Sequence, residues 1–268
     1  MQGVKVGLAL GAGAARGAAH LGVIAALLRE GIPIDVVAGT SAGSLVGAVY
    51  AAGMELERVI QLATHLSWDH LVELTVPRMG LIKGNKLLQF IRLITRNKTF
   101  ADLKIPFAAV AMDIESGEEV VISEGLVADA VRASCSIPGV FVPHRIGERL
   151  LVDGGVINRV PINVARQLGA DIVIGVDVGD SARVVKVNNI IDVIMQSIDI
   201  MEREIHREKV LTADVLIQPD LGPIASTNLE AATSCIAAGE AAAVQALPRI
   251  RELMEIRRID NQPGYRYN

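Results

Sequence analysis

The chain has 268 residues, of which 51% are hydrophobic, and its formal net charge is −4. It is long and apolar enough to bury a large core, and the absence of a linker, a repeat or a low-complexity stretch favours a single domain over residues 1–268. The acidic balance and the lack of a basic stripe exclude nucleic acid as an expected partner. Two cysteines, Cys135 and Cys235, are too few for a disulfide scaffold and fit a reducing compartment.

Strands and helices alternate along the chain. The first half predicts strands at 4–10 and 34–38 and helices at 18–30 and 44–52. Later runs predict strands at 107–112, 119–122, 150–152, 172–178 and 215–217, and helices at 87–94, 128–133 and 162–168. Continuous β-branched runs are typical of strands buried on both faces. We therefore predict an α/β fold, three layers deep, with a mostly parallel central sheet.

Two regions are less regular. Residues 53–99 carry an irregular helical pattern, which fits either a cap over a pocket or a plain connecting excursion. In the C-terminal elements at 181–256, residues 188–212 predict a long helix and 230–247 a closing helix, followed by a frayed tail at 257–268. The long helix has apolar residues on one side, for which core packing is favoured over docking to a membrane or a partner: Ile190, Ile191, Ile194, Ile198 and Met201.

The start of the chain carries no recognisable targeting signal. Residues 1–5 lead straight into an apolar strand, without the charged region and long apolar core of a secretory signal. No apolar run reaches the roughly 18 residues that a membrane-spanning helix requires. We expect a cytoplasmic protein, with any membrane contact peripheral and at the inner surface.

A serine occupies the turn between the strand at 34–38 and the helix at 44–52, in the string Gly39-Thr40-Ser41-Ala42-Gly43. A turn tight enough to raise the serine Oγ above the sheet crowds the residues two before and two after it, where Gly39 and Gly43 leave room. Free N–H groups at the start of the next helix favour negative charge on an acyl intermediate. We therefore predict Ser41 as a nucleophile; a merely flexible turn is the alternative.

The first strand leads into a glycine-rich turn at 11–17 that has three interpretations. A dinucleotide site would suit a strand, a glycine-rich turn and a helix, but the glycine spacing is wrong and Asp35 lies at the start, not the end, of the second strand. An oxyanion hole would use consecutive backbone N–H groups beside the neighbouring serine. A purely structural turn is the third interpretation.

A nucleophilic serine needs a base. None of the five histidines, His20, His65, His70, His144 and His206, lies late in the chain after a strand, where the usual hydrolase order would place it, although His144 is a secondary candidate. Asp153 is the better candidate, because it ends an apolar strand and is followed by Gly154 and Gly155, which allow close backbone approach. An ordinary Asp-Gly turn is the alternative.

The turn at 11–17, the serine string and Asp153-Gly154-Gly155 resemble the patatin-like phospholipase family in order and spacing, as does the segment 133–143 before the aspartate. The resemblance covers about residues 4–180. It implies a hydrolase of lipid acyl esters with a Ser–Asp dyad and no catalytic histidine, in which Ser41 is the nucleophile and Asp153 the base. It also implies no metal and no cofactor.

The same resemblance assigns roles to the glycine-rich turn. Backbone N–H groups of Ala12, Gly13 and Ala14 would form the oxyanion hole, and Arg16 would hold the loop or help to stabilise charge. Many members of the family have glycine where this chain has Ala12 and Ala14, so the backbone there must suit a Cβ. The rival hypothesis is a non-catalytic protein that binds an acyl ligand or a partner on the same fold.

Overall fold

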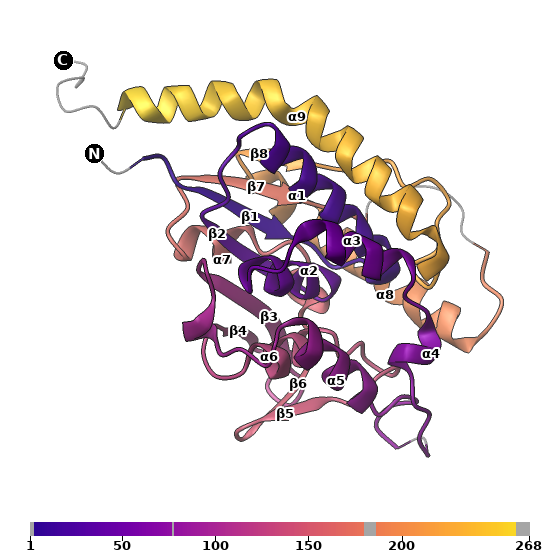
Figure 1. Ribbon diagram of the computed structural model, residues 1–268. Helices are drawn as coiled ribbons and strands as arrows, with labels where there is room; N and C mark the ends of the chain where they lie inside the picture. Colours follow the sequence, from indigo (N-terminus) through magenta and orange to yellow (C-terminus); the bar gives the residue numbers. More distant parts are fainter. Residues whose placement is uncertain (1–2, 77, 180–185, 261–268) are drawn as a thin grey trace.

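The computed structural model describes residues 3–76, 78–179 and 186–260, and a mixed sheet of eight strands forms the centre of this part (Figure 1). Its order is β5-β6-β3-β2-β1-β7-β8, with β4 also paired to β3. Neighbours among β1, β2, β3, β7 and β8 are parallel, whereas β4, β5 and β6 pair antiparallel. The strands are β1 (Val6–Leu10), β2 (Val36–Thr40), β3 (Phe107–Asp113), β4 (Glu119–Ile122), β5 (His144–Ile146), β6 (Arg149–Asp153), β7 (Ile172–Val176) and β8 (Val215–Ile217).

Helices cover both faces of the sheet. The α-helices are α1 (Ala19–Arg29), α2 (Ala42–Ala51), α3 (Leu56–Thr64), α4 (Trp68–Leu71), α5 (Asn85–Ile94), α6 (Val127–Ser134), α7 (Ile162–Gln167), α8 (Ile190–His206) and α9 (Ala232–Asp260). Short 3-10 turns include η1 (Ala14–Ala18), η3 (Gly154–Val156) and η4 (Lys209–Thr212). One face packs against α1, α2, α6 and α9, and the other against α7 and η4.

The alternation of side chains along the strands produces these two faces. In β1, Leu8 and Leu10 belong to the large core under α1 and α2, whereas Ala9 belongs to a smaller core under α7. In β7, Ile174 faces the large core and Val173 the small one. Both faces are buried, which explains the continuous apolar runs. The prediction of a three-layer fold with a mostly parallel sheet is confirmed.

The C-terminal helix is longer than its sequence pattern indicates. Helix α9 packs along α1, where small residues let the backbones approach: a Cβ at Gly22 would meet the carbonyl of Ile236, and one at Gly239 would meet the carbonyl of Ala19. The helix predicted at 230–247 continues through Pro248 to Asp260. The expected fraying is wrong for 257–260, and residues 261–268 lie outside the described part.

Helix α8 also differs from expectation. It ends at His206, and Lys209–Thr212 forms a separate 3-10 turn. The stripe predicted to pack in the core does so only in part, because the side chains of Ile190 and Met201 are 68% and 54% exposed. None of the helices in the described ranges is both long and apolar enough to cross a membrane.

Candidate active site

The turn after β2 has the geometry of an elbow. Ser41 has φ 53° and ψ −123°, a conformation that L-residues adopt only when the surrounding structure imposes it. A Cβ on Gly39 would lie 2.5 Å from the carbonyl oxygen of Gly43, and one on Gly43 would overlap the carbonyl of Leu10. Both glycines are therefore required by close backbone approach, as the sequence indicates. Helix α2 begins at the next residue, so its N-terminus points at Ser41.

Strand register brings Ser41 and Asp153 together. Thr40, the last residue of β2, pairs with Val110 of β3, and Asp153, the last residue of β6, pairs with the adjacent Ala111. Because β2 runs parallel to β3 and β6 runs antiparallel, the two strands end at neighbouring positions. Ser41 and Asp153 line one cavity, and both are buried.

Ser134 supports the elbow, a role that no sequence pattern indicates. The backbone N–H of Ser41 donates to Ser134 Oγ at 2.9 Å, and that hydroxyl donates to the carbonyl of Val110 at 2.6 Å. Ser44 Oγ donates to the carbonyl of Ser41 at 2.6 Å. The strained serine is thus held from both sides of its peptide unit.

Asp153 is held at its backbone and at its carboxyl group. Its N–H donates to the carbonyl of Ser136 at 2.9 Å, and Oδ1 accepts from the N–H of Gly155 at 2.8 Å. Burial raises the pKa of Asp153 to about 7, and hydrogen bonds from the Ser41 side chain and the Gly155 N–H oppose that rise. The negative charge of Asp199 raises the pKa further. A carboxyl group with this pKa is a much stronger base than an exposed aspartate.

Two of the three backbone N–H groups predicted for the oxyanion hole are without a partner in the described part of the chain. Ala12 donates to the carbonyl of Arg159 at 3.0 Å, so the expectation that its N–H contributes to an oxyanion hole is wrong. Gly11 likewise donates to Val176, which leaves these two groups unable to bind a dinucleotide phosphate. Within residues 3–76, 78–179 and 186–260, the N–H groups of Gly13 and Ala14 have no partner, and both residues line the cavity.

Ala14 has a backbone conformation that glycine adopts more easily. Its φ is 47°, in the left-handed region where a Cβ costs about 1 kcal/mol. The departure from glycine in the sequence therefore leaves the loop strained but intact. His20 also holds the loop, because its buried Nε2 donates to the carbonyl of Gly11 at 2.8 Å. Burial lowers the pKa of His20 to about 4, so its ring is neutral.

Arg16 holds the loop to helix α8. Its Nη2 lies 2.6 Å from Asp199 Oδ2, and the Arg16 side chain is almost fully buried. This contact joins the glycine-rich turn to α8. Its buried Nε has no hydrogen-bond partner in the described part of the chain. Nothing in the sequence pattern indicated Asp199 as the partner, because the two residues are 183 positions apart.

Helix α8 covers the cavity. Four of its residues line the cavity together with Ser41: Met195, Ile198, Asp199 and Glu202. The volume of the cavity is about 20 Å³, which is room for about one water molecule. Glu202 packs so closely on Gly155 that a Cβ there would overlap its carboxyl group, and a Cβ on Gly154 would overlap the carbonyl of Val110. Burial and the charge of Asp153 raise the pKa of Glu202. In this conformation the cavity is too small to hold a lipid ester.

The described histidine side chains do not join this site. None of the described histidine side chains lines the cavity of Ser41 and Asp153. His144, the secondary candidate, lies on β5 with its Nε2 3.5 Å from Asp129. His65 and His70 are exposed, and the side chain of His206 is outside the described part. The described residues also contain no group of three or more His, Cys, Asp or Glu side chains that could hold a metal ion. Cys135 and Cys235 are free and buried.

Comparison with solved structures shows the fold. The crystal structure of VipD from Legionella pneumophila matches with a TM-score of 0.67 at 15% identity, over 92% of this chain and 67% of that one. The crystal structure of the type III effector protein ExoU matches with a TM-score of 0.54 at 15% identity, over 92% of this chain and 53% of that one.

Sequence comparison shows the family. An uncharacterised NTE family protein of Mycobacterium tuberculosis is 39% identical over 180 residues, which are 66% of this chain and 50% of that protein. The patatin-like phospholipase domain-containing protein 6 of Homo sapiens is 35% identical over 187 residues, 67% of this chain and 14% of that protein. The chain thus spans half or less of these relatives. The family model described as patatin-like phospholipase matches residues 8–166, and the chain belongs to this family.

Proposed function

We propose that this protein is a serine acyl hydrolase that cleaves carboxylic esters of lipids, phospholipids or lysophospholipids, through a dyad of Ser41 and Asp153. The observation that carries the proposal is the register on β3, which places a strained serine beside a buried aspartate in one cavity. Membership of a phospholipase family and the name of the human relative support lipid esters as the substrate class.

The proposed reaction has two halves. Asp153 accepts the proton of Ser41 Oγ as that oxygen attacks the ester carbonyl carbon, and the N–H groups of Gly13 and Ala14 stabilise the resulting oxyanion. The tetrahedral intermediate collapses, the alcohol leaves with the proton from Asp153, and an acyl-enzyme remains. Water then attacks the acyl carbonyl while Asp153 again accepts a proton, and the fatty acid is released as Ser41 regains its hydrogen.

The dyad is tested by labelling with a fluorophosphonate probe, read by intact mass, beside hydrolysis of p-nitrophenyl acetate. We expect the wild type to be labelled at Ser41 and to hydrolyse the ester. Ser41→Ala is expected to abolish both signals, and Asp153→Asn to reduce both strongly while the fold is retained. Near-normal rates in Asp153→Asn would remove the dyad from the mechanism.

A non-catalytic binding protein is the second candidate. The observation that favours it is the small size of the cavity over Ser41, which α8 covers with Asp199 and Glu202. A folded wild type that neither labels nor hydrolyses any ester, with or without lipid vesicles, would support this function.

We also propose peripheral contact with the inner surface of a membrane by a cytoplasmic protein. Leu74 and Val76 are 80% and 76% exposed in the segment between α4 and α5, and Leu74 lines the same groove as the exposed Ile190 of α8. Such clustered apolar side chains are typical of contact surfaces. Co-sedimentation with phospholipid vesicles tests this: Leu74→Ser with Val76→Ser should weaken binding, and Val121→Ser, an exposed valine on β4, should not.

A further inference from the structure

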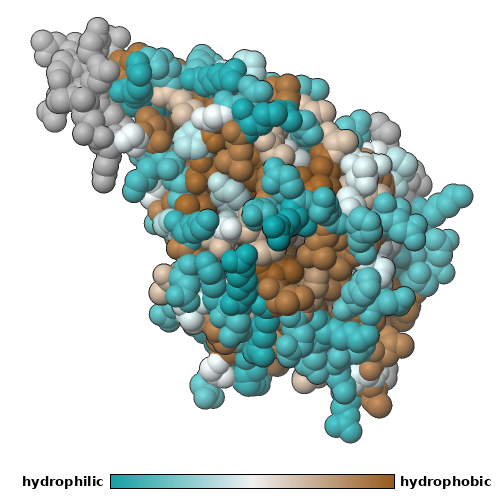
Figure 2. Space-filling model, in the orientation of Figure 1, coloured by the Kyte–Doolittle hydropathy of each residue, from teal (hydrophilic) through white to brown (hydrophobic). Residues whose placement is uncertain are grey.

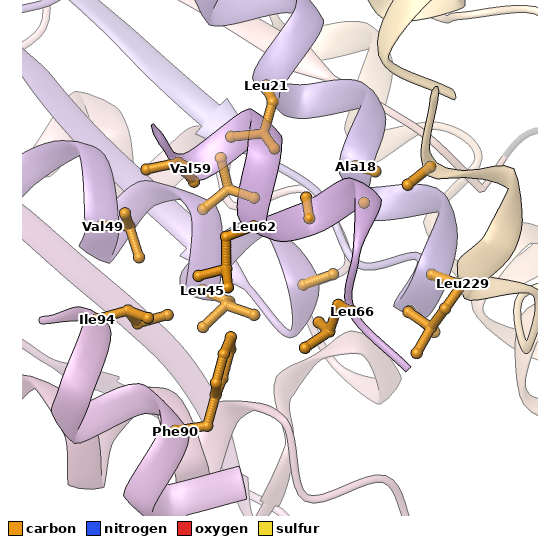
Figure 3. Close-up of a pocket in the computed structure, with 17 residues that line it drawn as sticks. Ala18, Leu21, Leu45, Val49, Val59, Leu62, Leu66, Phe90, Ile94 and Leu229 are labelled. Carbon is orange, nitrogen blue, oxygen red and sulfur yellow. The ribbon is translucent and has the colours of Figure 1, made fainter. Parts of the chain in front are cut away.

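A groove lies along α2 on the outer side of the helix layer. Its 17 lining residues are all alanine, glycine, valine, leucine, isoleucine or phenylalanine, and its volume is about 100 Å³. Figure 3 shows Leu45 and Val49 of α2 pointing toward the same space as Phe90 of α5, with Leu62 of α3 across from them. In Figure 2 apolar side chains gather in a hollow on this face, where Figure 1 places α2, α3 and α5.

The groove begins next to the candidate nucleophile. Ala42 follows Ser41 directly and lines the groove, and Ala14 lines both the groove and the cavity of Ser41. From Ala42 the groove follows one side of α2 through Leu45 to Val49, at helical spacings of three and four residues. Seven residues of helix span about 10 Å, which sets the length of the groove along α2.

We propose that this α2 groove holds the acyl chain of the ester that Ser41 attacks. The inference rests on the proposed hydrolase function and adds the binding site of the chain and the residues that set its length. The acyl chain is attached to the carbonyl carbon, so it must leave the site beside Ser41 and Ala14. The groove has no polar side chains, so a hydrocarbon chain that fills it buries no polar group without a partner. Each buried methylene strengthens binding by about fourfold.

A second groove also approaches the catalytic cavity, and its chemistry is different. It lies between α4 and α8, has a volume of about 680 Å³, and shares Ile137 and Met195 with the cavity of Ser41. Eleven of its 15 lining residues are apolar and four are polar, whereas the α2 groove has no polar side chain; the four are Thr75, Asn189, Asp192 and Thr227. These four polar residues, one of which is the carboxylate Asp192, suit the alcohol part of a lipid ester better than a hydrocarbon chain. The acyl chain is therefore assigned to the α2 groove, which has no polar side chain.

The test measures how the preferred acyl chain length depends on side chains along α2. Leu45→Phe fills the groove near Ser41, and Val49→Phe fills its far end. The kcat/KM values of each variant are measured with acetyl, butyryl, octanoyl and palmitoyl p-nitrophenyl esters and divided by its own value for the acetyl ester. We expect Leu45→Phe to lower the kcat/KM ratio for the butyryl or octanoyl ester and for all longer chains. We expect Val49→Phe to lower the ratio only for the longer chains. Each methylene that no longer fits should lower the ratio by about fourfold.

Controls separate the possible outcomes. Val72→Phe places the same side chain in the groove between α4 and α8 and is expected to leave the ratios unchanged. Phe90→Ala widens the α2 groove without added bulk and is expected to raise the palmitoyl ratio, which keeps the test valid if a phenylalanine variant misfolds. The assignment of the acyl chain to the α2 groove would be overturned if Val72→Phe alters the ratios and Leu45→Phe does not. It would also be overturned if neither variant alters them. A wild type that neither labels at Ser41 nor hydrolyses the acetyl ester would overturn the proposed function itself.

Discussion

Replacing the candidate base should stabilise the fold, and the size of the effect depends on pH. In the folded protein the pKa of Asp153 is raised from 3.8 to about 7, chiefly by burial. Ionising this carboxyl group therefore weakens the folded state relative to the unfolded one. Asp153→Asn keeps the shape of the protonated acid and an oxygen for the Gly155 N–H, but it cannot ionise.

The magnitude follows from the two pKa values. The interval from 3.8 to about 7 corresponds to about 4 kcal/mol at ~1.36 kcal/mol per pH unit. Because the folded-state pKa is the higher one, the folded state binds more protons in this interval, and stability falls as pH rises from about 4 to about 7. Above about 7 the penalty is complete. Asp153→Asn should thus be no more stable than the wild type at pH 3.5 and up to about 4 kcal/mol more stable at pH 8.

Urea unfolding at pH 3.5, 5.5 and 8, followed by circular dichroism, measures this difference. Ser41→Ala is the internal check, because it removes a hydrogen bond that lowers the pKa of Asp153 and should make the loss of stability with pH slightly larger. An Asp153→Asn variant whose stability relative to the wild type is the same at pH 3.5 and pH 8 would refute the reasoning, since burial of an ionised Asp153 would then carry no free-energy penalty.

Three further predictions concern the surroundings of the dyad. The kcat/KM for p-nitrophenyl acetate should rise with pH, with a midpoint at about pH 7, because Asp153 accepts a proton only when it is ionised. Asp199→Asn should move this midpoint to lower pH, because it removes a charge that raises the pKa of Asp153. An unmoved midpoint would contradict the role of that charge. Ser134→Ala leaves the Ser41 N–H unpaired and should cost about 1–3 kcal/mol of stability in urea unfolding, a loss that an equally stable variant would disprove. Gly43→Ala forces a Cβ into the carbonyl of Leu10 and should lower the thermal midpoint sharply, whereas Gly3→Ala, with no atom within 4 Å of the new Cβ, should not.

The fold was predictable because both faces of the sheet are covered. Continuous apolar runs such as 107–112 and 172–178 marked strands, and glycines such as Gly39 marked turns, without any need for distant contacts. The ends of α8 and α9 were not predictable in this way. Beyond Leu247, α9 buries Ile250 and pairs Arg251 with Glu30 at the end of α1, a contact between residues more than two hundred positions apart.

In the candidate site, too, residues in local patterns were predictable and residues placed by distant contacts were not. Ser41 and Asp153 were indicated by turns next to apolar strands, which are local patterns. The bond of Ala12 to Arg159 was not, because it depends on where a distant loop passes the turn. Ser134 was hidden for a similar reason: its position is fixed by the packing of α6 on β3, and a serine in a helix carries no signal of its partner.

Helix α8 links access to the site with the strength of its base. Its Asp199 binds Arg16 of the loop and raises the pKa of Asp153, and Met195 and Glu202 help to exclude the water that would lower this pKa. A displacement of α8 that admits an ester would also separate these charges from Asp153, unless the bound ester itself excludes water. The family match ends at residue 166 and includes Ser41 and Asp153 but not α8. The candidate nucleophile and the candidate base thus lie in the family-matched region, whereas the pKa of the candidate base depends on a helix outside it.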